Sequence, residues 1–209
     1  MKVITIGLIY GNRPLDIIRD NLSRAGFYTT HTFVNKEGIA NALNDGLDLM
    51  LKTGSDAVAF LSNDIKEPNN WLHKKVQALL EYPDAGAVAS SIHEVETEIR
   101  SQLIISNWLV SREAVNRVGY FQESMFPYGP IDLDYCQRLW AAGLKTYYVK
   151  DCLALHNGSH ATGDEYGWNK DELVAAGWGK MYKQGEPFKI ERLCQVKKEE
   201  NQEEKNTTQ

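Results

Sequence analysis

The chain has 209 residues, 43% hydrophobic and 24% charged, which is enough to bury one sizeable core. Its formal net charge of −5 argues against a general nucleic-acid-binding surface. No apolar stretch approaches the ~20 residues that a transmembrane segment requires. The three cysteines, Cys136, Cys152 and Cys194, lack the spacing of a metal or redox site. We therefore expect a cytoplasmic protein with reduced thiols.

The first half of the chain alternates between strand and helix patterns. Apolar or β-branched runs predict strands at residues 2–9, 28–34, 56–62 and 87–91. Helical spacing of apolar residues predicts helices at residues 14–26, 37–52 and 68–81. Strict alternation of this kind predicts a parallel sheet with right-handed crossovers.

The second half is less regular. It predicts a strand at residues 103–110, helices at 111–119 and 132–142, a strand at 146–149 and a last helical segment at 169–183. Residues 93–102, 121–131 and 156–164 are expected to be loops. We expect one domain over residues 1–193 and a disordered charged tail over 194–209.

Three polar clusters follow predicted strands or open predicted helices: Asn63-Asp64, Asp132 with Asp134, and 156–160. Ligands of open α/β sheets gather beyond the carboxyl ends of the strands, so we expect the clusters to converge there. A carboxylate with an imidazole suits a cation such as Mn²⁺. A carboxylate at a helix start is favoured in its ionised form and could act as a general base.

Several segments, in chain order, also match a known pattern. They are Asn12-Arg13-Pro14, Gly38-Ile39-Ala40-x-Ala42-Leu43-Asn44-x-Gly46-Leu47, Phe60-Leu61-Ser62-Asn63-Asp64 with Pro68-x-x-Trp71-Leu72, Ser111-Arg112-Glu113-Ala114-x-x-x-Val118-Gly119-x-Phe121, Tyr128-Gly129-x-x-Asp132-x-Asp134-Tyr135-Cys136-x-Arg138-Leu139-x-x-Ala142-Gly143, and His156-x-Gly158-Ser159. Together they resemble the motifs of family-two glycosyltransferases of the GT-A fold, over residues 3 to 185.

The resemblance implies an α/β fold of GT-A type: a Rossmann-like, mixed and mostly parallel sheet flanked by helices. Residues 1–91 would form the nucleotide-sugar-binding half and 92–193 the acceptor and catalytic half. The implied reaction is inverting transfer of a sugar from a nucleotide-sugar, usually a UDP-sugar, to a hydroxyl of a glycan or other acceptor. Mn²⁺ (or Mg²⁺) would assist as a Lewis acid.

The resemblance also implies roles for individual residues. Asp64 and His156 would bind the metal, and Asp132 would be the general base. Tyr10, Arg13, Asn35, Asn44 and Asn63 would lie near the donor. Trp108, as a stacking platform, and Tyr128 are the candidates for acceptor contact.

The chain departs from the family pattern at three places. Ser62 and Asn63 stand where many members carry further aspartates, and Asn35-Lys36-Glu37 replaces an Asp-rich turn. Ile131 replaces the glutamate that usually precedes the base, so a shifted alignment would make Asp134 the base. His160 is a rival to His156 as metal ligand.

Two other functions remain open at this point. One is a glycosyltransferase-like protein that binds nucleotide or glycan without turnover. The other is a nucleotidyltransferase, which would need a Gly-rich basic loop that Gly11-Asn12-Arg13 matches poorly.

Overall fold

The computed structural model describes residues 1–8, 15–26, 30–34, 39–91, 98–99, 107–122 and 131–156. Within these ranges, seven strands form one mixed sheet in the order β2-β1-β3-β7-β5-β8-β6. The strands are β1 (Val3–Leu8), β2 (Thr30–Val34), β3 (Ala57–Ser62), β5 (Ala85–Ser91), β6 (Glu98–Ile99), β7 (Trp108–Ser111) and β8 (Lys145–Leu153). The short strands β4 (Ile65–Lys66) and β9 (Leu155–His156) pair with each other in a separate two-stranded sheet.

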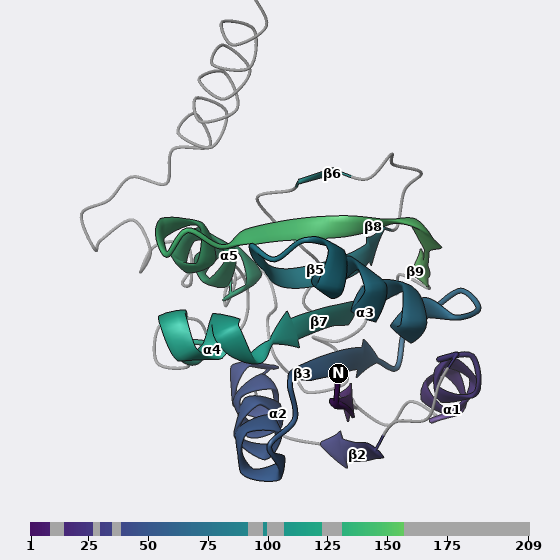
Figure 1. The fold of residues 1–209 in the computed structure, drawn as a ribbon. Coiled ribbons are helices and arrows are strands. Elements are labelled where there is room, and N and C mark those ends of the chain that lie inside the picture. Colours follow the sequence, from purple (N-terminus) through teal and green to yellow (C-terminus); the bar gives the residue numbers. More distant parts are fainter. Residues whose placement is uncertain are drawn as a thin grey trace, which may run out of the picture.

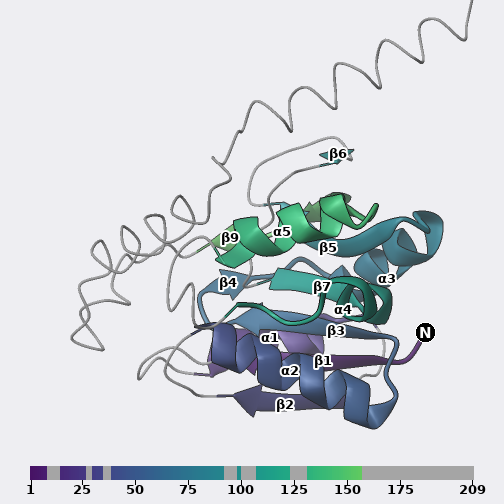
Figure 2. The ribbon, with the colours of Figure 1, turned by 90° about the vertical axis from the view of Figure 1, so that its left-hand side faces the viewer.

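Helices cover both faces of the large sheet. They are α1 (Asp16–Ser23), α2 (Ile39–Thr53), α3 (Trp71–Glu81), α4 (Arg112–Val118) and α5 (Ile131–Ala141). One apolar cluster packs α2, α4 and α5 against one face, and a second packs α3 against the other, with α1 on the same side (Figures 1 and 2). The predicted GT-A-type fold, with a mixed and mostly parallel sheet flanked by helices, is confirmed.

The directions of the strands define one functional edge. β1, β2 and β3 pair in parallel, and β5 pairs in parallel with β8. β7 lies between β3 and β5 and is antiparallel to both, so β5 and β8 run the same way as β3. The carboxyl ends of the parallel strands therefore meet at one side of the molecule, where β4 and β9 also lie (Figure 2).

Close packing fixes α2 over the first strands. β1 and β3 are buried along their whole lengths, as their continuous apolar runs predict. A Cβ atom on Gly46 of α2 would lie 2.5 Å from Cε1 of Phe60 on β3. The glycine thus allows the helix backbone to approach the sheet closely.

Several element boundaries differ from the predictions. α3 begins at Trp71 and not at Pro68, and β8 continues to Leu153. β4, β6 and β9 were not predicted, because two-residue strands carry no periodic signal, and β6 lies within residues 93–102, which were expected to be a loop. The loop, helical segment and tail expected after residue 156 lie outside the described residues. No helix within the described ranges combines the length and apolar character needed to cross a bilayer.

Candidate functional site

The structure brings Asp64 and His156 together at the carboxyl end of β3. The chain leaves β3 at Ser62, turns through Asn63 and Asp64, and enters β4. β4 pairs antiparallel with β9, so that Ile65 lies opposite His156. This register places Nε2 of His156 3.6 Å from Oδ2 of Asp64, although the two residues are 92 positions apart in the chain.

The two oxygens of the Asp64 carboxylate have different surroundings. Oδ1 accepts a hydrogen bond from the Ser62 hydroxyl, and the Asp64 backbone N–H points to the same hydroxyl at 3.4 Å. Oδ2 is the oxygen that faces His156. The side chain of Asp64 is 18% exposed and that of His156 is 40% exposed, so the pair opens to solvent.

This geometry fits a divalent cation. Carboxylate oxygen and imidazole nitrogen bind such ions at about 2.0–2.2 Å, so two adjacent ligands of one ion stand roughly 3 to 3.5 Å apart. The observed 3.6 Å separation is close to this range. The described residues contain no group of three or more His, Cys, Asp or Glu side chains able to hold a metal. Two protein ligands would leave further coordination positions of such an ion open.

Helix α5 begins at the same edge of the sheet. A tight turn with Gly143 in the left-handed region joins α5 to β8, so the helix runs antiparallel to that strand and starts at its carboxyl end. Asp132 is the second residue of α5, and its Oδ1 accepts a hydrogen bond from the backbone N–H of Leu133 at 2.9 Å. The predicted location of Asp132 at a helix start is therefore confirmed.

Asp134 has a structural environment. Its carboxylate accepts from Nε of Arg138 at 2.9 Å and contacts Nη2 at 2.8 Å. Arg138 also donates to the backbone carbonyl of Val118 at 2.7 Å, which ties α5 to the end of α4. Burial raises the pKa of Asp134, while the charge of Arg138 acts in the opposite direction.

Two residues expected near the donor have other contacts. Asn44 on α2 donates from Nδ2 to the carbonyl of Phe121 and accepts from the Phe121 N–H, both at 2.9 Å. Its amide therefore fixes the segment that follows α4, a structural role that the sequence did not predict. Asn63 is buried beneath the turn and exposes almost no surface to a donor. Tyr10, Arg13 and Asn35 lie outside the described residues.

Trp108 is a core residue and not an acceptor platform. Its side chain is fully buried, with ring centroids 6.1 Å from Phe121 and 5.9 Å from Tyr135. A ring enclosed in this way offers no face to a sugar, so the stacking prediction was wrong. The other acceptor candidate, Tyr128, lies outside the described residues, as does His160.

A buried ion pair beside the site was not predicted from the sequence. Nζ of Lys75 lies 3.0 Å from Oε1 of Glu67, and both side chains are 0% exposed. The detectable signal was Lys75 itself. It lies three residues after Leu72 and one before Val76, on the apolar stripe of α3, where a charged side chain requires a partner.

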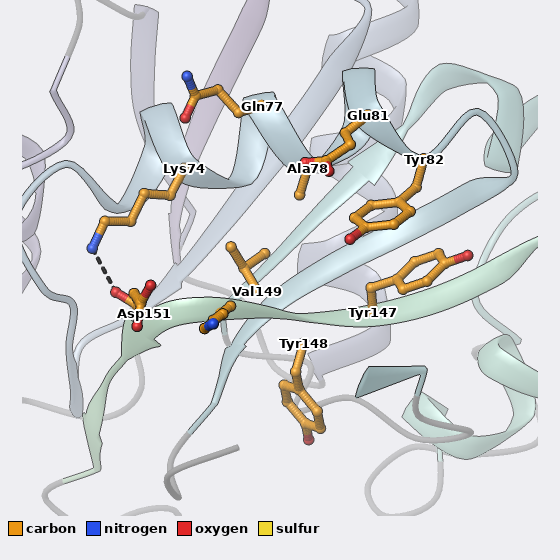
Figure 3. A pocket seen from close by; sticks show the side chains of 10 residues that line it. Lys74, Gln77, Ala78, Glu81, Tyr82, Tyr147, Tyr148, Val149 and Asp151 are labelled. Atoms are coloured by element: carbon orange, nitrogen blue, oxygen red, sulfur yellow. Dashed lines mark hydrogen bonds between the residues drawn. The ribbon is translucent and has the colours of Figure 1, made fainter. Parts of the chain in front are cut away.

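A separate hollow of about 260 Å³ lies between α3 and β8 (Figure 3). Its walls include Tyr82 and Tyr147, whose rings stack at 4.6 Å, and Lys74, which donates to the backbone carbonyl of Asp151 at 2.5 Å. Among the residues that the structure describes, no predicted site residue lines this hollow. It is distinct from the Asp64–His156 pair.

No protein-family model and no curated protein matches the chain. Solved structures do match it. A197 from STIV has a TM-score of 0.58 and 16% identity, covering 76% of this chain and 87% of that one. GalNAc-T7, solved with UDP, GalNAc and Mn²⁺, has a TM-score of 0.59 and 9% identity, covering 74% of this chain and 43% of that one. The mannosyltransferase PcManGT from Pyrobaculum calidifontis, solved with GDP-Man and Mn²⁺, has a TM-score of 0.58 and 15% identity, covering 88% of this chain and 65% of that one.

These similarities establish the fold. The chain has the fold of GT-A glycosyltransferases, and it spans less than half of GalNAc-T7 and about two thirds of PcManGT. At these identities the comparisons assign neither donor nor stereochemistry.

Proposed function

We propose that the chain is an inverting, divalent-metal-assisted glycosyltransferase that transfers a sugar from a nucleotide-sugar, in the first instance a UDP-sugar, to an acceptor hydroxyl. The observation that carries the proposal is the Asp64–His156 pair, 3.6 Å apart at the end of β3 in a fold of GT-A type. Ligands of open α/β sheets bind at this edge. Two structural neighbours were solved with a nucleotide or nucleotide-sugar and Mn²⁺, which supports the same reading.

In the proposed mechanism Asp64 and His156 would hold Mn²⁺ or Mg²⁺, which would supply positive charge to stabilise the diphosphate leaving group. The Ser62 hydroxyl holds Oδ1 of Asp64 and leaves Oδ2 directed at the imidazole. Asp132, near the positive end of α5, takes the proton of the acceptor hydroxyl. The acceptor oxygen then bonds to the anomeric carbon from the face opposite the nucleoside diphosphate, and the bond to that diphosphate breaks.

One observation favours a second candidate, a protein that binds nucleotide-sugar without turnover. Position 62 carries a serine, whose hydroxyl donates to one oxygen of Asp64. An aspartate at this position would instead add a second negative charge near the ion. An ion held by fewer carboxylates binds more weakly, so the protein would bind the donor without catalysing transfer.

A thermal-shift panel of nucleotide-sugars with and without Mn²⁺ tests the proposal. At roughly 100-fold excess over Kd a ligand stabilises by about 2.7 kcal/mol, and for a chain of this size that raises Tm by about 5–10 °C. Asp64→Asn should lose the Mn²⁺-dependent part of the shift. Asp56→Asn is the matched control, because Asp56 lies at the opposite end of β3, where its carboxylate accepts from Lys2 N at 2.6 Å.

The outcomes separate the candidates. A Mn²⁺-dependent shift that Asp64→Asn loses and Asp56→Asn keeps, together with sugar transfer, supports the proposal. The same shift without release of nucleoside diphosphate supports binding without turnover. A panel without any Mn²⁺-dependent shift refutes the metal-assisted enzyme, and a panel without any shift, with or without Mn²⁺, refutes both.

A further inference from the structure

A buried polar network fills the space between β4 and the end of β8. Lys75 donates from Nζ to Oε1 of Glu67 at 3.0 Å and to the backbone carbonyl of Asn107 at 2.7 Å. The Ser90 hydroxyl donates to Oε2 of Glu67 at 2.5 Å and lies 3.0 Å from Sγ of Cys152. The Glu67 carboxylate therefore has a buried partner on each oxygen.

The network connects the two halves of the Asp64–His156 pair. Glu67 follows β4, which begins directly after Asp64, and Cys152 lies in β8, which leads to β9 and His156. Ser90, at the end of β5, contacts both Glu67 and Cys152. A continuous line of buried contacts thus runs from the Asp64 side to the His156 side.

A second set of contacts fixes the backbone of β4 to α1. The buried side chain of Asn21 donates to the carbonyl of Ile65 at 2.7 Å and accepts from the Glu67 N–H at 2.8 Å. Nε1 of Trp71 donates to the Asn21 carbonyl at 2.7 Å. β4 is consequently held at the carbonyl of Ile65, the residue that pairs with His156, and at the N–H of Glu67, directly after the strand.

A bulge in β8 brings Cys152 into this network. Ser90 pairs with Val149, but Ser91 pairs with Leu153, so residues 150–152 are extra on β8. Asp151 adopts φ 57°, in the left-handed region, and Lys74 donates to its carbonyl (Figure 3). The bulge bends β8 so that the next residues pair with β4.

We propose that Glu67, Lys75 and Ser90 are positioning residues that hold β4 and β9 in the register at which Asp64 and His156 face one cation. The role of that cation rests on the proposed function. Replacing a buried ion pair by apolar residues of the same volume often leaves stability unchanged or higher, so we assign orientation and not stability to this pair. The same contacts would keep the two ligands in place before the ion arrives.

The test compares two variants with one control. Glu67→Gln combined with Lys75→Met removes the charges and nearly preserves the volume, and Ser90→Ala removes only the bridging hydroxyl. Glu113→Gln is the control, since it breaks an exposed ion pair with Arg117 on α4, within a helix remote from the network. Circular dichroism establishes that each protein is folded.

Two measurements follow on the folded proteins. Electron paramagnetic resonance titration with MnCl₂ alone gives the affinity, which should fall about tenfold or more in the network variants and stay unchanged in the control. Without metal, the NMR signal of the His156 imidazole, assigned with His156→Gln, should shift on Asp64→Asn in the wild-type background. That shift should shrink in the network variants, because the two side chains no longer face each other.

Folded network variants that keep both the Mn²⁺ affinity and the NMR coupling overturn the positioning role. The two proposals fail separately. If wild type and Asp64→Asn bind Mn²⁺ equally, the proposed metal function is lost, whereas the metal-free coupling still decides the positioning role. If Ser90→Ala alone keeps the coupling, the bridge through Ser90 is refuted.

Discussion

Replacing Asn44 with Ala separates a structural role from donor binding. The Asn44 amide makes two hydrogen bonds of 2.9 Å to the backbone of Phe121, 77 residues away in the chain. The Phe121 ring is buried and stacks on Tyr135 at 4.1 Å, so its backbone cannot move freely towards water. Each lost bond costs about 1 kcal/mol, and more where the remaining partner stays dry. We expect a total loss of about 2–3 kcal/mol, or about 4–12 °C in Tm.

Urea denaturation with an unchanged m value measures this loss. Asp48→Asn is the matched control on α2, because Asp48 accepts a hydrogen bond from the exposed Tyr120 hydroxyl in the same segment. We expect the control to change stability by less than about 0.5 kcal/mol. If Asn44→Ala keeps wild-type stability but loses affinity for nucleotide-sugar, the structural role of the Asn44–Phe121 hydrogen bonds is refuted. The donor-binding role inferred from the sequence is then supported.

Three further outcomes are expected. Gly46→Ala should lower the free energy of unfolding by about 1–3 kcal/mol in urea denaturation, because its Cβ would lie 2.5 Å from Phe60 Cε1. Alanine is the better helix former, so a stabilised variant would contradict this reasoning. Burial raises the pKa of Asp134 in the folded state above its ordinary value of 3.8. The folded protein therefore keeps this proton to a higher pH than the unfolded chain does. As the pH rises from 3.8 through the raised pKa, the wild type should lose unfolding free energy relative to Asp134→Asn. A difference in unfolding free energy that is constant with pH argues against the raised pKa. Burial also raises the pKa of the Cys152 thiol, so its alkylation by iodoacetamide, followed by mass spectrometry, should be much slower in the native protein than in urea; equal rates would show that the thiol is accessible.

The sequence predicted the sheet and the proximity of Asp64 and His156 because both depend on local signals. The run from Ala57 to Leu61 is continuously apolar, which indicates a strand buried on both faces and places the following Asp64 at its carboxyl end. Parallel strands share that edge, so a histidine after a later strand was expected nearby. The 3.6 Å separation of Asp64 and His156 agrees with that expectation.

The errors arose where long-range pairing decides the environment. β7 has four residues, too few to show which face is buried or which way the strand runs. It is central, between β3 and β5, so Trp108 is covered on one face and Leu109 on the other. The Asn44–Phe121 hydrogen bonds and the bulge before His156 likewise depend on contacts between distant segments. No local pattern in the sequence indicates such contacts.

The same reasoning distinguishes the two carboxylates of α5. Residues two apart on a helix point to opposite sides, so Asp132 and Asp134 cannot both face one cleft. Asp134 faces Arg138, one turn further along, and through it the end of α4. Asp132 therefore points away from that contact, at the helix end nearest the carboxyl edge, and is the better candidate for the proposed base. Asp132→Asn should lower the rate of sugar transfer by about 10²–10⁴-fold with donor affinity retained, whereas Asp134→Asn should lower it less than about tenfold. The reverse order of effects in a single-turnover assay would assign the base to Asp134.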